Sequence, residues 1–397
     1  MSTTTLQAPA RTAVYDFVAF LADADSEEIF REFAKRQAIA NPHVQRGSVQ
    51  HAVGFVEQQP RSPRLLVVDI AGMSMPLPAI DRLAEACEPG VSVVVVGDQQ
   101  DVALFRQLLT IGVADYLVKP LTTEVLLQVI GRDLTLSPAR RSARTGKIVT
   151  FTGARGGVGA TSLATSLAWL IANRHNRRVA FVDLDTHGGG GPLLLDLEVG
   201  GLAEALANAP QQDALLLDRA MVRHGERLFC LSAEKDFDQE ARLDLDALDQ
   251  LLIQLEQQFH YVVLDLPRRP GPLYRFALER AAVQVVVVDR TLPAVHNVVR
   301  LTPLLGGQRG RTIYVLNEHH PSGQSPLDRE SIERSLGRGF DLVVAFDRTV
   351  PDRGDNLGEP LAAGRGPFAT AVRRLAADLS GQHLTRPGRF ARLLGKA

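Results

Sequence analysis

A glycine-rich segment at residues 151–167 has the composition of a phosphate-binding loop. It reads FTGARGGVGATSLATSL, follows a predicted strand and opens a predicted helix, which is the context such a loop requires. Gly156, Gly157 and Gly159 let successive backbone N–H groups curl around a phosphate, and the start of the helix adds a favourable dipole. Thr161 stands at that start, where a hydroxyl suits Mg²⁺. The segment therefore predicts a phosphate site.

Acidic residues end several predicted strands. Asp69 ends a buried strand in the first half, Asp183 and Asp185 end the stretch FVDLD, and Asp265 ends YVVLD. Open α/β sheets bind their ligands at the carboxyl ends of strands. An aspartate at a strand end can instead cap the following helix. Position alone leaves both roles open for each of these residues.

The elements that must position these residues follow two αβ rhythms. Short runs of β-branched residues alternate with helical patterns, which is typical of a parallel sheet covered on both faces. In the first half we predict strands at residues 14–22, 65–70, 91–96 and 114–118, and helices at 26–37, 78–86, 101–111 and 122–132. In the second half we predict strands at 148–152, 179–182, 228–231, 261–265, 285–288, 312–316 and 342–345, with helices between them, notably at 161–172, 245–258 and 367–379.

A polar, proline-containing stretch at residues 133–146 separates the two rhythms and reads as a linker. We therefore predict two doubly wound α/β domains with parallel sheets, at residues 13–132 and 147–380. Residues 1–12 are predicted to be a flexible N-terminus and residues 381–397 a tail. The tail contains RPGRFARLLGKA, for which a membrane-touching basic amphipathic helix and a frayed solvated end are the alternatives; the second is favoured because only three large apolar residues are present.

Composition agrees with a globular protein of the cytoplasm. The chain has 397 residues, of which 45% are hydrophobic and 22% charged, and a formal net charge of -1. This balance gives no overall attraction to nucleic acid or to a membrane. No run approaches the roughly 18 apolar residues needed to span a bilayer. The two cysteines, Cys87 and Cys230, fit no metal-ligand spacing and are predicted to be buried thiols in a reducing compartment.

The stretch GVADYLVKP at residues 112–120 closely resembles the last strand of receiver domains, which have the flavodoxin-like fold. The resemblance implies that Asp69 is the phosphoacceptor position, that Lys119 contacts the phosphoryl group, and that Asp23 and Asp25 form the acidic pair that holds Mg²⁺. A carboxylate nucleophile needs such cations to offset the charge of the incoming group.

The first half departs from the receiver pattern at two points. Asp23 and Asp25 are separated by Ala24 instead of adjacent, and Gly97 stands where the family has a hydroxyl. Two interpretations stay open: a phosphorylated domain, or a fold kept for protein contacts. These departures favour the second, because folds often outlast their chemistry.

The second half resembles the ParA/MinD superfamily of P-loop proteins. That family's loop runs lysine, two glycines, any residue, glycine, lysine and serine or threonine. Here the loop is Arg155-Gly156-Gly157-Val158-Gly159-Ala160-Thr161. Arg155 therefore replaces the lysine that contacts nucleotide across a dimer, and Ala160 replaces the lysine that reaches the β- and γ-phosphates. Arginine keeps a charge that suits phosphate, although its fork is no point-charge substitute.

The same resemblance covers the rest of residues 147–379. It implies that Asp183 and Asp185 organise Mg²⁺ and the attacking water, that Asp265 holds Mg²⁺ through water, and that Asn317 lies against the adenine. Residues 346–360 resemble the family's late loop near the base. The implied nucleotide-binding residues are Arg155, Gly156, Gly157, Val158, Gly159, Ala160, Thr161, Ser162 and Asn317, with Thr161 and Asp265 for the metal.

Loss of the lysine at position 160 is expected to weaken ATP and Mg²⁺ binding. One charge-assisted hydrogen bond in a shielded site contributes about 1.5–3 kcal/mol, or roughly tenfold or more in affinity. The loss for phosphoryl transfer is expected to be larger, because the lysine also meets charge that develops in the transition state. Binding is expected to be weak or absent, and so is hydrolysis.

A receiver-like half followed by a degenerate ParA/MinD half resembles the CpaE/TadZ family of pilus assembly proteins. The resemblance implies a localisation factor for a Tad/Flp pilus or secretion machine, at the cell pole or the inner face of the inner membrane. Expected partners are a second copy, proteins of that machine and a polar marker protein. The copies are expected to pair over their P-loops, with Arg155 reaching the partner's site.

Two other functions are weighed against this one. An active partitioning ATPase would bind DNA nonspecifically, which needs a basic face; overall charge gives no support, although Arg268, Arg269, Arg275 and Arg280 follow one strand closely. No specific nucleic acid partner is therefore predicted. A regulator driven by phosphorylation of Asp69 is the other alternative.

Overall fold

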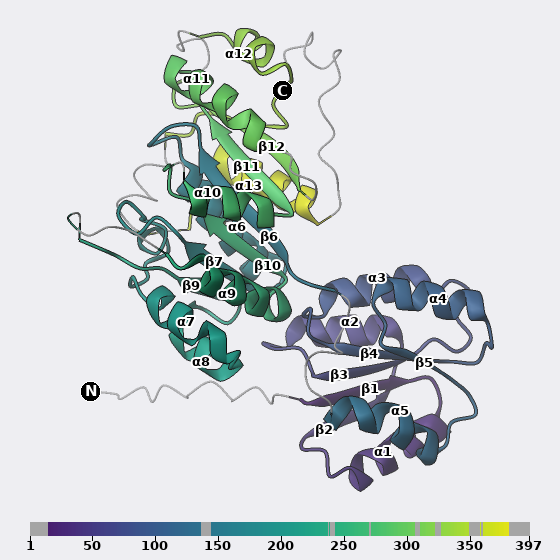
Figure 1. The fold of residues 1–397 in the computed structure, drawn as a ribbon. Coiled ribbons are helices and arrows are strands. Elements are labelled where there is room, and N and C mark those ends of the chain that lie inside the picture. The colour runs from purple at the N-terminus through teal and green to yellow at the C-terminus, as the bar shows by residue number, and fades with distance from the viewer. Residues whose placement is uncertain are drawn as a thin grey trace, which may run out of the picture. The chain divides into compact units, whose positions relative to one another are not determined.

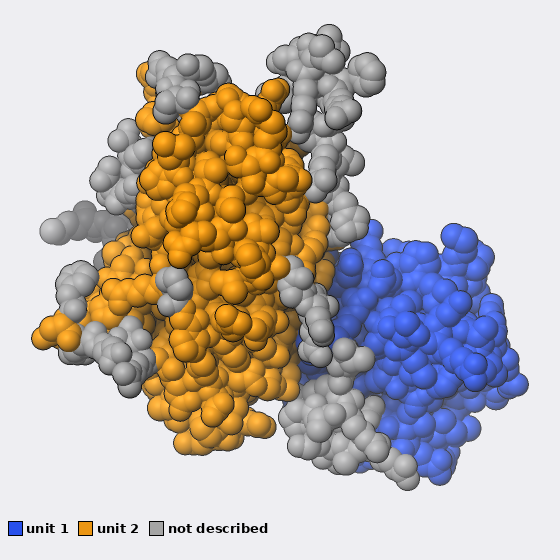
Figure 2. Space-filling model, turned by 45° about the horizontal axis from the view of Figure 1, so that its top comes forward, with its two compact units in different colours: residues 1–145 blue, residues 146–397 orange. Residues whose placement is uncertain are grey.

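The computed structural model describes residues 15–135, 144–236, 238, 243–269, 271–305, 310–321, 327–348, 358 and 360–380, with the backbone alone at 131–135. The chain divides into two compact units, residues 1–145 and 146–397 (Figure 2). Helix α5 continues to Thr135, so the first residues of the predicted linker are helical. Residues 1–12, most of that linker and the tail at 381–397 lie outside the described residues.

The first unit is a five-stranded parallel sheet with helices on both faces (Figure 1). The strand order β2-β1-β3-β4-β5 is the flavodoxin-like order. Its strands are β1 (Phe17–Leu21), β2 (Pro42–Arg46), β3 (Leu65–Asp69), β4 (Ser92–Gly97) and β5 (Asp115–Val118). Its helices are α1 (Ala24–Arg36), α2 (Val49–Gln58), α3 (Leu77–Ala86), α4 (Val102–Ile111) and α5 (Thr123–Thr135). The predicted doubly wound fold is confirmed for this unit.

Two apolar layers hold this sheet. Alternate residues of β1, β3 and β4 point to opposite faces, so a continuous valine run fills both layers. One layer packs against α2, α3 and α4 and contains Ile80 and Leu108. The other packs against α1 and α5 and contains Phe30, Phe33 and Leu126.

Strand β2 and helix α2 were not among the predicted elements. Strand β2 reads PHVQR and lies at the edge of the sheet, where none of its residues is fully buried. An edge strand that carries polar side chains lacks the buried apolar run on which the other predictions depended. Ser48 is the N-cap of α2, and its backbone N–H donates to Nδ1 of His51 at 3.1 Å.

The second unit is an eight-stranded sheet of order β13-β12-β11-β6-β10-β7-β9-β8 (Figure 1). Its strands are β6 (Lys147–Gly153), β7 (Val179–Asp183), β8 (Val222–His224), β9 (Leu228–Leu231), β10 (Tyr261–Asp265), β11 (Val283–Val288), β12 (Arg311–Asn317) and β13 (Leu342–Val344). All neighbours are parallel except β8, which pairs antiparallel with β9. The predicted parallel fold is confirmed, and the short edge strand β8 is an addition to it.

Helices cover both faces of this second sheet. They are α6 (Ala160–Arg174), α7 (Leu202–Asn208), α8 (Ala214–Ala220), α9 (Leu245–Gln258), α10 (Pro272–Arg280), α11 (Leu292–Leu301), α12 (Arg329–Leu336) and α13 (Pro367–Leu379). Helices α6 and α13 pack on one face, which contains Phe151 and Val285. Helices α7 to α12 pack on the other face, in two clusters that contain Val262 and Val286 respectively.

Both cysteines are buried free thiols, as predicted. Within the described part of the chain, no helix has the length and apolar character needed to cross a membrane.

Candidate functional site

The glycine-rich loop joins β6 to α6 and follows the conformation that its composition predicts. Gly157 and Gly159 have φ values of +71° and +88°, a region that residues with a Cβ rarely adopt. Gly159 is the N-cap of α6. A Cβ at position 159 would lie 2.6 Å from Nδ2 of Asn317. The backbone conformation and the nearby Asn317 side chain therefore both require glycine at position 159.

Thr161 and Asp265 form the part of the site that suits a metal. The Thr161 hydroxyl donates to Oδ2 of Asp265 at 2.7 Å, and Asp265 lies opposite Asp183 in the register of β10 and β7. Burial, with the charges of Asp183 and Asp185, raises the pKa of Asp265 against the opposing Thr161 hydrogen bond. These oxygens fit Mg²⁺, which proteins often hold with one or two carboxylates while water and phosphate complete its shell.

Asp183 is held by the backbone of the glycine run that follows it. Its carboxylate accepts the N–H of Asp185 at 3.0 Å and the N–H of Gly191 at 3.1 Å. Burial raises the pKa of Asp183 to about 6, the Asp185 charge adds to the rise, and the two N–H donors oppose it. A Cβ at Gly189 would lie 2.6 Å from both carboxylate oxygens. The run therefore closes tightly around Asp183.

Asp185 also holds this glycine run in place. Its Oδ1 accepts the N–H of Gly188 at 3.0 Å, and its carbonyl accepts the N–H of Gly189 at 2.8 Å. Asp183 and Asp185 thus have structural contacts of their own, and their catalytic roles stay predictions. Among the residues that the structure describes, no group of three or more histidine, cysteine, aspartate or glutamate side chains is arranged to hold a metal ion.

Arg155 and Ala160 occupy the two cation positions of the loop. The Arg155 guanidinium is paired with the buried Asp289 of its own chain: Nε donates to Oδ2 at 2.8 Å and Nη2 donates to the same oxygen. Ala160 packs against the apolar layer under α6. Sequence reasoning missed Asp289, although it directly follows a buried valine run, as Asp69 and Asp265 end theirs.

Asn317 ends β12 beside the loop. Its Nδ2 donates to the carbonyl of Val158 at 2.9 Å, and Nε2 of His319 lies 3.3 Å from the same oxygen. The structure therefore brings Asn317 to the loop backbone, while its contact with adenine stays a prediction. Ser162, also predicted to bind nucleotide, is half-buried in the first turn of α6.

Lys119 lies between two carboxylates in the first unit. Its ammonium is 2.6 Å from Oδ2 of Asp69 and also pairs with Asp23. Asp69 accepts the N–H groups of Ala22 at 3.0 Å and Ala71 at 2.9 Å. Burial by itself would lower the pKa of Lys119, but its hydrogen bonds to Asp23 and Asp69 and their charges raise it. We call Asp23, Asp69 and Lys119 the lysine cluster.

Asp23 has a second contact that fixes its position. It caps α1 by accepting the N–H of Ser26 at 2.7 Å. Burial opposes its ionisation, but Lys119 and Ser26 outweigh this and lower the pKa of Asp23 to about 2. Asp25, by contrast, lies exposed in the first turn of α1 and lines a shallow hollow with Glu28 and Glu32. The lysine cluster assembles with Asp23 and without Asp25.

Tyr116 explains why position 97 is a glycine. A Cβ at Gly97 would lie 2.3 Å from the Tyr116 hydroxyl oxygen and 2.8 Å from Cε2 of the ring. The hydroxyl donates to the carbonyl of Gln99 at 2.9 Å, which holds the ring in this position. The place of the missing hydroxyl side chain is thus filled by the tyrosine of the next strand.

Comparisons with known proteins agree with this geometry. The family described as cellulose biosynthesis protein BcsQ matches residues 146–324. The chain is 26% identical over 226 residues to the septum site-determining protein MinD of Synechocystis sp., covering 54% of this chain and 81% of that protein. The structure of MinD from Pyrococcus horikoshii OT3, complexed with Mg-ADP, matches with a TM-score of 0.51 and 16% identity, over 61% of this chain and all (100%) of that one. The second unit therefore has a ParA/MinD-like P-loop fold.

A further solved structure concerns a pilus protein. The pilus assembly protein CpaE from Caulobacter crescentus CB15 is 32% identical and matches 30% of this chain and 93% of that chain, with a TM-score of 0.28.

The four arginines that follow β10 differ in exposure and in ion pairing. Arg280 pairs with Asp249 at 3.1 Å and with Glu256 at 2.8 Å. Arg268, Arg269 and Arg275 are exposed. The late loop predicted near the base falls mostly outside the described residues, which include 346–348, 358 and 360 of it.

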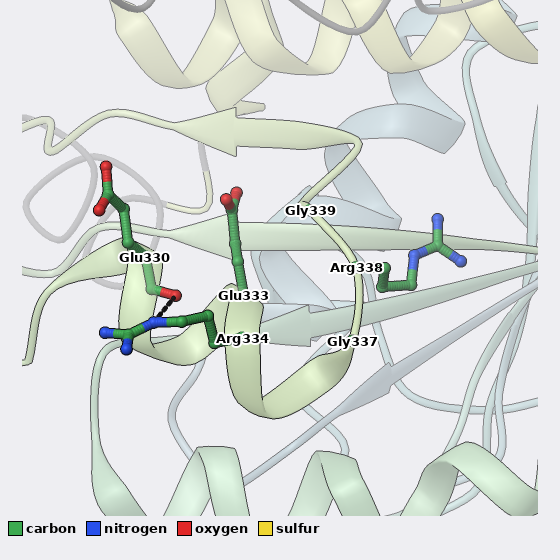
Figure 3. Close-up of a pocket in the computed structure, with 6 residues that line it drawn as sticks. All are labelled: Glu330, Glu333, Arg334, Gly337, Arg338 and Gly339. Carbon is green, nitrogen blue, oxygen red and sulfur yellow. Dashed lines mark hydrogen bonds between the residues drawn. The ribbon is translucent and has the colours of Figure 1, made fainter. Parts of the chain in front are cut away.

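A hollow of about 450 Å³ beside α12 is a weaker candidate (Figure 3). Figure 3 shows its residues on α12 and the following turn, none of them from the phosphate-binding loop. Glu333 accepts a hydrogen bond from Arg329 at 2.8 Å, and Arg338 pairs with Asp341 at 2.7 Å. Charges that already have partners leave little for a ligand to bind.

Proposed function

We propose that this protein is an assembly or localisation factor for a Tad/Flp-type pilus or secretion machine. It acts as a dimeric scaffold whose hydrolysis of ATP is weak or absent. Support comes from the order of its two folds, a flavodoxin-like unit followed by a ParA/MinD-like domain, and from the state of the phosphate-binding loop. Its place is the cytoplasm, at the cell pole or the inner face of the inner membrane, and its partners are proteins of that machine and a polar marker.

One observation carries the proposal: neither of the two cation positions of the loop offers a free positive charge to a phosphate. Ala160 presents a methyl group, and the Arg155 guanidinium is paired with Asp289. The backbone cradle and the Thr161–Asp265 pair remain. Shape without the charge that phosphoryl transfer requires favours a scaffold over a motor.

The loop and the carboxylates fit a magnesium nucleotide, although with reduced affinity. The N–H groups of residues 156–161 would surround the phosphates, and Thr161 with Asp265 would hold Mg²⁺. When bound, Mg²⁺ would offset phosphate charge. The chain's own residues would fix the loop through Asn317, which donates to the carbonyl of Val158.

Ala160→Lys is expected to raise affinity for ATP by about tenfold, because it restores a charge-assisted hydrogen bond to the phosphates. Calorimetric binding and phosphate release should be measured for the wild type and the variant. Gly156→Ala is the control, because a Cβ at position 156 would lie in open space and the substitution changes the loop without adding charge. Brisk turnover by the wild type, abolished by Asp265→Ala, would defeat the scaffold proposal.

The copies are expected to pair constitutively over the loops, since hydrolysis would not reset the pairing. Mass in solution should be compared with and without ATP, using the full chain. A dimer under both conditions is the expected result. A monomer that pairs only after ATP is added would refute constitutive pairing while leaving the weak hydrolysis untouched.

We also propose that the lysine cluster of the first unit serves the fold and its protein contacts. The ammonium of Lys119 is taken up by two carboxylates, and the ring of Tyr116 fills the place of the receiver hydroxyl. This role replaces phosphorylation of Asp69, which stays the alternative.

A further inference from the structure

Asp289 lies at the end of β11, directly beside the strand that leads into the phosphate-binding loop. β11 and β6 are neighbours, with Val287 opposite Gly153, and Arg155 follows two residues after that glycine. The Asp289 side chain is 3% exposed, whereas that of Arg155 is 29% exposed. The ion pair thus joins a buried carboxylate of one strand end to the half-exposed guanidinium of the next.

Every nitrogen of the Arg155 guanidinium and both carboxylate oxygens of Asp289 have a hydrogen-bond partner within the chain. Oδ1 of Asp289 accepts the Thr291 hydroxyl at 2.8 Å, while Oδ2 accepts Nε and Nη2 of Arg155. The remaining nitrogen, Nη1, donates to the carbonyl of Gly156 at 2.7 Å. A planar fork fixed at three nitrogens has one orientation, because each bond restricts the others.

The stretch from 154 to 161 contains one cationic residue, Arg155. Asp289 neutralises it, so the loop offers a phosphate only N–H dipoles. A ligand phosphate that recruits the guanidinium must leave the buried Asp289 without its partner, which is strongly unfavourable. The observed affinity for the phosphate is then the intrinsic affinity multiplied by the fraction of molecules in which the ion pair is open, so a small open fraction means weak binding.

We propose that Asp289 is a positioning residue that latches Arg155 inside its own chain and keeps it from nucleoside polyphosphates. The latch lowers phosphate affinity beyond the loss of the lysine at position 160. Its release, by substitution or by a competing anion, returns the guanidinium to the loop. This inference rests on the phosphate-binding loop named in the proposed function, and it concerns affinity and not hydrolysis.

The test is the affinity of the full chain for a fluorescent ATP analogue in excess Mg²⁺. Asp289→Asn is expected to tighten binding about tenfold, because the amide no longer holds the guanidinium by charge. Asp289→Glu, which can keep the pair, is expected to stay nearer the wild type. Arg155→Met is expected to bind no tighter than the wild type, and the gain should vanish in the Asp289→Asn/Arg155→Met double variant.

A neighbouring ion pair supplies the matched control. Glu318 pairs with Arg290 at 2.7 Å and directly follows the adjacent strand β12. Glu318→Gln also removes a carboxylate from an arginine and is expected to leave the affinity unchanged. Thermal unfolding of every variant separates lost affinity from lost structure.

Asp289 is buried, so a second variant protects the test against misfolding. Arg155→Lys replaces the fork with a point charge that makes fewer contacts with Asp289, and it is also expected to tighten binding. The latch is overturned if folded Asp289→Asn and Arg155→Lys bind no tighter than the wild type, or if the gain persists without Arg155. Rapid ATP turnover by the wild type would instead count against the scaffold proposal alone.

Discussion

Lys119→Met is expected to lower the free energy of unfolding of the first unit by about 3–5 kcal/mol, the range for removing one partner of a buried ion pair. The Asp69 side chain is 0% exposed and has lost its counter-charge in this variant, whereas Asp23 is 45% exposed and can be solvated. The loss therefore comes mainly from Asp69, which two N–H donors hold in place.

Hydrogen exchange of peptides from β3 and β5, followed in urea, measures this loss in the first unit. The single tryptophan, Trp169, lies on α6 in the second unit, so its fluorescence reports that unit separately and should not change. Lys35→Met on the exposed face of α1 is the control and is expected to stay within about 0.5 kcal/mol. Adding Asp69→Asn to Lys119→Met should recover part of the loss. Unchanged exchange in Lys119→Met would show that the lysine cluster does not stabilise the unit.

Gly97→Thr is expected to destabilise the first unit by about 2–3 kcal/mol, at the upper end of overpacking costs, because the strand around it is buried. The new Cβ would meet the Tyr116 hydroxyl at 2.3 Å and the ring carbons Cε2 and Cζ at 2.8 and 2.9 Å. Restoring a receiver-like hydroxyl by this substitution alone should therefore fail.

Substitutions of Tyr116 test whether its side chain causes the loss of stability in Gly97→Thr. In Tyr116→Phe the hydroxyl contact at 2.3 Å is gone but the ring carbons at 2.8 and 2.9 Å remain, so Gly97→Thr should cost less than in the wild type and still destabilise. In Tyr116→Ala the obstacle is gone, and the cost of Gly97→Thr should fall by most of its value in a double-mutant cycle. Gly54→Ala is the matched control, because this helical glycine has open space and alanine there should stabilise by about 0.5–1 kcal/mol. An equal cost of Gly97→Thr in all backgrounds would rule out Tyr116 as the cause.

Much of the fold was readable because buried strands are continuous apolar runs. The run at residues 91–96 predicted β4, and YVVLD predicted β10 to the residue. The acidic residues at strand ends followed from the same pattern, since parallel strands bring their carboxyl ends to one edge. Strand β2 escaped because an edge strand is solvated and has no such run.

Partnerships across the sheet were not readable. The pairing of Arg155 with Asp289 joins residues 134 apart in sequence, and no local pattern links them. The position of the Tyr116 ring beside Gly97 likewise depends on the register between β4 and β5. From the sequence, Gly97 was interpreted as the loss of a hydroxyl side chain, whereas the structure shows that the Tyr116 side chain occupies the space such a side chain would need. Such contacts are set by tertiary packing, which periodicity and spacing do not encode.

The two borders of the eight-stranded sheet limit how copies of this protein can associate. β13 and β8 are three residues each, and β8 runs against its neighbour. A border this short offers few open backbone groups to a strand from another molecule, which protects the sheet from growing into a fibre. Pairing of copies through the edges of this sheet is therefore disfavoured, which leaves the helices and loops of this unit as its surfaces for contacts with other molecules.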